Sequence, residues 1–414
     1  MKFSIVSVSL LISILFFTHA SHSSQSCPAA VPEKYAHVKP GNVAAAYFAG
    51  WDIYGQSKYT VKDLYPIADK LTHVVYAFVK PNPQTGKCEL QDPWADVGAN
   101  FEKRKKVAGN FAKLIELKKN FPQLKVLLSV GGGTYSKDIS EIVQKGLLKT
   151  FAKSCVDILD KFEYQFKHTK TGLDSSVLYE YEGLFDGLDL DWEWLNNVVP
   201  EEEAKAYQTM IISLKKLLNE RTKRQGKRSL LTVALQVNQK VYNALPLKKC
   251  VSFVDWFHVM AYNFTTTDGN GVGHNAPICN PWSSFSVDNA ISGLMDLDIS
   301  PHKLVLGVPL YGHVFDKTKN KLGSAFEKTD ITGSVTYDQI KKLYVQNALC
   351  KYRWNDKSKV PSLYCPASEV FVSFDDERSV QEKVVYAKQK LLRGVVFWKL
   401  AGDDEEHNLI KSVF

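Results

Sequence analysis

Eight short β-rich runs, separated in several places by amphipathic helical segments, predict an α/β chain folded as a closed (β/α)8 TIM barrel. Strands that alternate with helices favour a parallel sheet, and eight of them favour a closed barrel over an open doubly wound sheet. The length is compatible with this fold, because 414 residues, or about 394 without a signal segment, suit an α/β barrel that carries insertions.

The strands are expected in order along the chain, each as a run rich in β-branched, aromatic and small apolar residues. Their residues are 43–51, 72–79, 125–132, 187–194, 230–237, 256–263, 303–312 and 394–400. The clearest helix is 201–220, "EEEAKAYQTMIISLKKLLNE", whose apolar residues recur at helical spacing. Before the eighth strand, Ser379 and Glu382 have the spacing of a capping box, which predicts the start of a helix there.

One long interval interrupts this alternation. Residues 313–373 separate the seventh strand from the seventh helix, and "SVTYDQIKKLY" and "WNDKSKVPSLYC" within them are too structured and aromatic for a linker. We therefore expect a small α+β insertion domain at 313–373, and a catalytic barrel made of residues 21–312 and 374–414.

The N-terminus has the features of a secretory signal. Lys2 precedes an apolar run at residues 5–17, and small residues lead to an expected cleavage site after about Ala20. We expect residues 1–20 to be removed and the protein to be secreted, extracellular or periplasmic. The apolar run is shorter than the roughly 20 residues that span a bilayer, so the alternative of an uncleaved membrane anchor is disfavoured.

Seven cysteines in an exported chain predict some disulfides, and the odd count leaves at least one thiol over. Their pairing stays open at this point. No Cys-x-x-Cys or His-x-x-x-His spacing is present, so we expect no metal site and no cofactor. The net charge of +8 is spread through mixed Lys/Glu helices, which argues against nucleic-acid binding. A monomer is expected.

The stretch "FDGLDLDWEWL", residues 185–195, combines acidic residues with regular apolar spacing. In a strand, alternate residues face opposite sides, so Asp189, Asp191 and Glu193 share the face that points into the barrel, and the leucines face the helices. A calcium loop is the rival interpretation of clustered aspartates. Such loops require polar spacing and a central glycine, which this stretch lacks.

Carboxylates at alternate strand positions lie roughly 7 Å apart. At an effective dielectric constant near 20, two such charges repel by about 2.4 kcal/mol, so at least one group should hold a proton near neutral pH. Glu193, last on this face and nearest the mouth of the barrel, is the predicted general acid. The alternative is a buried polar network that only fixes the fold.

At these residues the chain resembles a known family. The run from Asp186 to Glu193 is similar to the DGxDxDWE signature of glycoside hydrolase family 18, the chitinases. "SVGG", "LTHVVYAF", "MAYN", "VLGVPLYG" and "GVVFWKLAGDD" resemble further strands of this family, and "YDQI", "KVPSLY" and "FVSFDDERS" resemble the insertion of its bacterial-type members.

The resemblance implies retaining hydrolysis of β-1,4-linked N-acetylglucosamine, with the substrate's own acetamido group as the nucleophile. Glu193 would protonate the glycosidic oxygen and later activate water. Asp191 would hold the acetamido N–H and share a proton with Asp189, and Tyr262 would hydrogen-bond the acetamido carbonyl.

The remaining implied site residues bind substrate, and Trp398 among them would form the apolar floor under the sugar. The implied substrate-binding residues are Trp398, Asn263, Met260, Tyr47, Trp51 and Asp186. Tyr47, Trp51 and Met260 could equally belong to the barrel core.

Four positions depart from the family pattern. Asn263 stands where Asp is usual, His313 where Arg is frequent and Gly133 where Trp is common, and Trp194-Leu195 replaces a frequent Tyr-Pro. These changes affect the expected rate, pH profile and subsite preference more than the activity itself.

Three functions follow from the resemblance. The first is a secreted chitinase that acts on chitin or its oligosaccharides. The second is a chitin-oligosaccharide-binding lectin, disfavoured because such lectins typically replace the residue at Glu193. The third is an endo-β-N-acetylglucosaminidase, disfavoured because the insertion deepens the cleft for a linear polymer.

Overall fold

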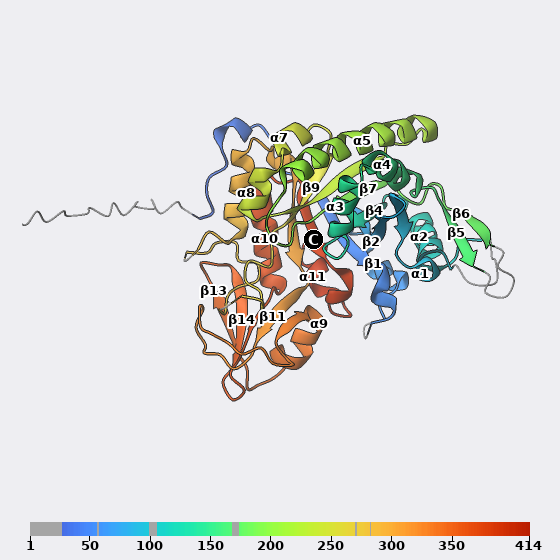
Figure 1. The fold of residues 1–414 in the computed structure, drawn as a ribbon. Coiled ribbons are helices and arrows are strands. Elements are labelled where there is room, and N and C mark those ends of the chain that lie inside the picture. The colour runs from blue at the N-terminus through green and yellow to red at the C-terminus, as the bar shows by residue number, and fades with distance from the viewer. Residues whose placement is uncertain (1–26, 56–57, 99–105, 168–173, 270, 282) are drawn as a thin grey trace, which may run out of the picture.

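The computed structural model describes residues 27–55, 58–98, 106–167, 174–269, 271–281 and 283–414; the expected signal segment, residues 1–20, lies outside these ranges. Eight parallel strands form a ring in the order β1-β16-β10-β9-β8-β7-β4-β2, closed by pairing of β1 with β2 (Figure 1). The predicted (β/α)8 barrel is therefore confirmed. The strands are β1 (Val43–Ala49), β2 (His73–Asn82), β4 (Lys125–Gly131), β7 (Gly187–Asp191), β8 (Leu230–Gln236), β9 (Trp256–Met260), β10 (Leu304–Pro309) and β16 (Gly394–Trp398).

All eight expected strands are present, but seven of them end earlier than expected, and β7, β9 and β10 each end three residues early. The seventh run breaks after Pro309, and Tyr311–Phe315 forms a separate strand, β11, which pairs outside the ring. The acidic run leaves the sheet at Asp191, so Glu193 lies two residues beyond the end of β7. The side chain of Glu193 is therefore not oriented by strand pairing.

Helices surround the ring, as Figure 1 shows, apart from α9 (Tyr337–Ile340), which lies against β11 outside the ring. They are α1 (Pro93–Val97), α2 (Gly109–Asn120), α3 (Ser136–Gln144), α4 (Leu148–Asp157), α5 (Glu201–Gln225), α6 (Gln239–Ala244), α7 (Leu247–Cys250), α8 (Val287–Asp296), α9 (Tyr337–Ile340), α10 (Glu377–Gln389) and α11 (Asn408–Lys411). The longest, α5, begins with three glutamates, ends with Lys223 and Arg224, and stops at Gly226 in the left-handed conformation with φ 69°. This charge order complements the helix dipole.

The capping prediction for α10 needs a correction. The helix begins at Glu377, and its N-cap is Asp376, whose side chain accepts a hydrogen bond from the Ser379 backbone. Ser379 is the third helical residue, and its Oγ accepts a hydrogen bond from the Asp376 backbone N–H, so Glu382 plays no part in the cap. The same motif is present three residues earlier than expected, because an aspartate can replace serine as the N-cap.

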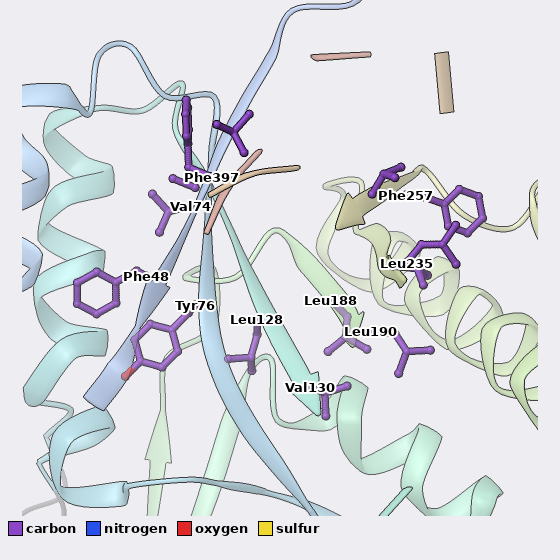
Figure 2. Close-up of a cluster of buried hydrophobic side chains, with 14 of the residues drawn as sticks. Phe48, Val74, Tyr76, Leu128, Val130, Leu188, Leu190, Leu235, Phe257 and Phe397 are labelled. Carbon is purple, nitrogen blue, oxygen red and sulfur yellow. The ribbon is translucent and has the colours of Figure 1, made fainter. Parts of the chain in front are cut away.

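The period of two along the strands divides the core into two layers. Leu188 and Leu190 of β7 point outward and pack with Leu128, Val130 and similar residues beneath the helices (Figure 2). A smaller inner cluster fills the barrel itself and contains Val43, Ala45, Tyr47, Val75, Ala77, Phe78, Leu127, Trp256, Val305 and Val396. The opposite face of β7 therefore turns Asp189 and Asp191 toward this inner layer.

Residues after β10 form a separate five-stranded antiparallel sheet, which lies below the barrel in Figure 1. Its order is β12 (Gly333–Thr336), β11 (Tyr311–Phe315), β15 (Val370–Ser373), β14 (Val360–Cys365) and β13 (Lys351–Asn355). Three strands outside the ring were not predicted. β3 (Lys87–Leu90) pairs with the end of β2, and β5 (Lys161–Lys167) forms a projecting hairpin with β6 (Asp174–Glu180).

Two disulfides are formed, Cys27–Cys279 and Cys350–Cys365. Cys88, Cys155 and Cys250 are free and buried, which agrees with the expectation of leftover thiols. Within the described ranges, no helix combines the length and the apolar character needed to cross a bilayer.

A buried ion pair joins α10 to the segment that precedes it, and it yields a prediction. Lys383 Nζ contacts Asp375 Oδ1, and both side chains are at most 1% exposed. Replacing Lys383 by Met leaves Asp375 buried without its cation, so we expect the free energy of unfolding to fall by about 3–5 kcal/mol. Chemical denaturation measures it. Lys342→Met removes the half-exposed pair with Asp338 and should cost under about 1 kcal/mol. Equal losses in the two variants would contradict the buried-pair argument.

Candidate active site

A cavity of about 580 Å³ opens at the C-terminal ends of the barrel strands. This is the end at which (β/α)8 barrels carry their functional groups. Seven of the predicted site residues line it together with Asp191: Tyr47, Trp51, Glu193, Met260, Tyr262, Asn263 and Trp398. Asp189 lies beneath the cavity with no exposed surface. Tyr47 belongs to both the inner core and the cavity wall, so the two alternatives for this residue are not exclusive.

Asp189 is surrounded by hydrogen-bond donors from four other strands. Its Oδ2 accepts from Ser129 Oγ at 2.7 Å and from Tyr47 Oη at 2.9 Å. Its Oδ1 accepts from Thr232 Oγ1 at 2.5 Å and lies 3.3 Å from His258 Nδ1. Burial acts to raise the pKa of Asp189, but contact with His258 and these hydrogen bonds outweigh it and hold the pKa below its usual value. Asp189 is therefore the ionised member of the cluster.

Asp191 has the opposite environment, although it lies only two residues further along β7. Burial raises its pKa well above the usual value, and the nearby carboxyl groups of Glu193 and Asp189 raise it further. Its Oδ1 is buried with no hydrogen-bond partner among the described residues. A proton shared in this part of the site therefore favours Asp191 over Asp189, and Asp191 has capacity for a polar ligand.

Glu193 has its pKa raised to about 7, and the cause is burial; a hydrogen bond from the Gly133 backbone N–H acts in the opposite direction. The expectation of a protonated acid is thus met mainly by loss of solvent rather than by the charge repulsion that the sequence suggested. Gly133 stands close to this group, since a Cβ at position 133 would lie 3.3 Å from Glu193 Oε1. The missing side chain leaves the carboxyl group accessible on that side.

Two polar side chains hold the backbone around Glu193, and sequence reasoning did not identify either. Ser136 Oγ accepts a hydrogen bond from the Glu193 N–H at 2.7 Å and donates to the Gly132 carbonyl at 3.0 Å. Gln236 Oε1 accepts from the Trp194 N–H at 2.6 Å. Since β7 has ended at Asp191, these contacts replace strand pairing and fix the carboxyl group.

Aromatic rings form one wall of the cavity. Trp398 at the end of β16 packs edge-on against Tyr47, with ring centroids 5.2 Å apart, and stacks with Phe78 at 5.9 Å. Trp51 continues the row, 5.7 Å from Phe78. Sequence reasoning did not identify Phe78. In a regular β2, residue 78 would share the outward face of Tyr76, but the pairing between Tyr76 and Val79 is shifted, and Phe78 lines the cavity instead.

The unusual residues Asn263 and His313 meet in the structure. Asn263 Oδ1 accepts from His313 Nε2 at 3.0 Å and from Tyr311 Oη at 2.7 Å. Burial lowers the pKa of His313 to about 4, so this imidazole is neutral at neutral pH. Asn263 also adopts a left-handed conformation with φ 59°, which asparagine tolerates better than most residues. Two departures from the family pattern therefore form one neutral hydrogen bond.

Asp186 does not belong to this cavity. It precedes β7, at the end of the barrel opposite Glu193, and it is buried. Its Oδ2 accepts from Lys118 Nζ at 2.7 Å and from the Val126 N–H at 2.8 Å, and its Oδ1 lies 2.5 Å from Lys227 Nζ. The expected role of Asp186 in substrate binding is therefore wrong. These contacts make Asp186 part of the framework at the closed end of the barrel.

In the part of the chain that the structure describes, no group of three or more His, Cys, Asp or Glu side chains is arranged to hold a metal ion.

Comparison with known proteins identifies relatives of this site and fold. The family model of the glycosyl hydrolases family 18 matches residues 43–403. Chitinase A1 of Niallia circulans is 30% identical over 96% of this chain, which spans 60% of that protein's length. Chitinase ChiA74 from Bacillus thuringiensis superposes with a TM-score of 0.76 at 28% identity, covering 90% of this chain and 70% of that one. The Group IV chitinase of Ostrinia furnacalis, solved with allosamidin, gives 0.74 at 26% identity and covers 90% and 97%.

The raised pKa of Glu193 can be measured directly. We expect the side-chain carboxyl carbon of Glu193, followed by 13C NMR, to titrate with a midpoint near pH 7, compared with an ordinary value of 4.5. Glu201 serves as an internal reference, because its hydrogen bond to Lys205 lowers its pKa. Glu193→Gln assigns the signal by removing it. A midpoint for Glu193 at or below pH 5 would contradict the burial argument.

Proposed function

The chain belongs to the glycosyl hydrolases family 18, and from this we propose that it hydrolyses the β-1,4 bonds between N-acetylglucosamine units of chitin. The observation that carries the proposal is Glu193 at the cavity, with its pKa raised to about 7 and Asp191 beside it. A carboxylic acid that keeps its proton near neutral pH is suited to protonate a leaving oxygen. The chitinase names of the relatives support the same substrate.

In the proposed reaction, Glu193 donates its proton to the glycosidic oxygen as the bond to C1 breaks. The carbonyl oxygen of the substrate's acetamido group attacks C1 from the opposite face and forms an oxazolinium ion. Asp191 accepts the acetamido N–H, and Tyr262 donates its hydroxyl proton in a hydrogen bond to the acetamido oxygen. The Glu193 carboxylate then removes a proton from water, whose oxygen attacks C1. The C1–O bond of the oxazolinium ring breaks, the acetamido group is regenerated, and the original configuration at C1 is restored.

The surrounding groups have proposed roles in binding and electrostatics. The negative charge of Asp189 favours the positive charge that develops on the sugar. Trp398, with Phe78 and Tyr47, offers a flat apolar surface to one face of the sugar ring. Asn263 and Met260 complete the cavity wall. Activity should fall as pH rises through about 7, because the acid then loses the proton that it must donate.

Export is also proposed. The signal segment at residues 1–20 supports it, and so do two disulfides, because such bonds persist mainly in oxidising compartments. We further propose that the barrel, residues 21–312 and 374–414, and the insertion, residues 313–373, act together as one catalytic unit.

The decisive test compares the secreted protein with Glu193→Gln on N-acetylglucosamine oligosaccharides. We expect the wild type to cleave them and the variant to lose at least about 100-fold in kcat, because the amide cannot transfer a proton. Product analysis by chromatography gives both rates. Glu141→Gln, on the exposed side of α3, controls for the substitution itself and should retain activity.

Equal and near-zero turnover of wild type and Glu193→Gln would overturn the chitinase proposal. Oligosaccharide binding retained under those conditions would indicate a lectin instead. Cleavage of glycoprotein glycans, with chitin oligosaccharides untouched, would indicate an endo-β-N-acetylglucosaminidase.

The hydrogen bond from Ser136 makes a separate prediction about placement of the acid. Ser136→Ala should lower kcat by about 10- to 100-fold and leave KM nearly unchanged, because a small displacement of Glu193 affects chemistry more than binding. Ser136→Thr restores the hydroxyl and should recover most of the rate. Ser140→Ala removes a hydroxyl from the same helix without contact to Glu193 and serves as control. A Ser136→Ala enzyme with wild-type kcat would exclude this positioning role.

A further inference from the structure

His258 lies beneath the catalytic cavity, and polar groups contact both of its ring nitrogens. It projects from β9 with 1% of its surface exposed. The Trp256 indole Nε1 donates a hydrogen bond to His258 Nε2 at 2.9 Å. On the other side of the ring, Nδ1 lies 3.0 Å from Tyr47 Oη and 3.3 Å from Asp189 Oδ1.

The chemistry of the indole group decides which nitrogen carries the proton. Indole N–H is a donor only, so Nε2 must offer its lone pair and the imidazole proton must be on Nδ1. Tyr47 donates its own hydroxyl proton to Asp189, and its oxygen is then free to accept from the Nδ1–H. The hydrogen bonds thus run in one direction, from Trp256 through His258 and Tyr47 to Asp189.

We propose that Trp256 and His258 are positioning residues, and that Trp256 fixes the His258 tautomer with its proton on Nδ1, which directs this N–H at Tyr47 and toward Asp189. This inference deepens the proposed glycosidase mechanism and rests on it for its catalytic meaning.

The groups that contact His258 come from three strands. They are Tyr47 of β1, Asp189 of β7 and Trp256 of β9. His73 of β2 and the Arg393 guanidinium lie against the Trp256 ring, the guanidinium at 4.7 Å. The adjacent strands β8 and β10 contain no titratable residue. Asp189 is therefore the main charge in contact with the imidazole.

The tautomer can be measured without any assay of activity. NMR of the wild-type protein with 15N-labelled histidine should show His258 protonated on Nδ1 alone. Trp256→Phe removes the donor, and we expect it to allow the other tautomer. Trp192→Phe is the matched control, because the Trp192 indole is buried with no hydrogen-bond partner among the described residues. It should leave the His258 signals unchanged.

A wild-type signal from the Nε2–H tautomer would overturn the proposal, even if Trp256→Phe failed to fold. The result is also independent of the proposed reaction. An inactive protein with the Nδ1–H tautomer would refute the glycosidase proposal and leave the tautomer assignment in place.

The catalytic meaning is tested by kcat/KM on chitin oligosaccharides. Trp256→Phe should lower kcat/KM about tenfold, because the Nδ1–H is then no longer held toward Tyr47 and Asp189. His258→Asn retains an N–H toward Tyr47 but has no tautomer to be fixed. Adding Trp256→Phe to His258→Asn should therefore produce no further loss. If the same fall occurred in the double variant, the tryptophan would act through packing and the proposal would be wrong.

Discussion

The burial of ionisable groups along one face of β7 is the constraint on which the rest of the site depends. A carboxylate without water is costly unless hydrogen bonds replace its solvation, and Asp189 obtains these contacts from Ser129, Thr232, Tyr47 and His258. These residues belong to β4, β8, β1 and β9. Closure of the barrel therefore supplies the hydrogen bonds that replace water around this charge, while burial, together with the nearby carboxyl groups, raises the pKa of Asp191. The Asp189 side chain therefore links closure of the barrel to the electrostatics of the site.

Local patterns predicted the barrel well because each strand carries its own signal. Runs such as those of β4 and β8 are apolar on both faces and short, and helices such as α5 have a regular apolar stripe, so their positions depend little on distant residues. The hairpin of β5 and β6 and the end of β7 were not predicted. Both are set by what the strands meet in three dimensions, which periodicity does not report.

The same contrast between local patterns and contacts made in three dimensions explains which features of the site were predicted. The period-two alternation placed Asp189 and Asp191 on one face. The sequence suggested charge repulsion as the cause of the raised pKa of Glu193, because burial could not be read from the sequence. Ser136 and Gln236 were missed because they reach Glu193 and its neighbour from other elements. Asp186 was misassigned because the resemblance to a motif does not separate residues that bind substrate from residues that hold the framework; its partners Lys118, Val126 and Lys227 come from other parts of the chain.

The three free cysteines give this molecule a built-in reporter of its own integrity. Cys155 lies against Cys88 in the interior, and burial raises its thiol pKa well above the usual value and that of Cys250 to about 12. Alkylating reagents attack the thiolate, so neither group can react until the surrounding structure opens. The rate of thiol labelling in native buffer thus tracks the opening of the α4 and α7 regions separately, with no engineered probe.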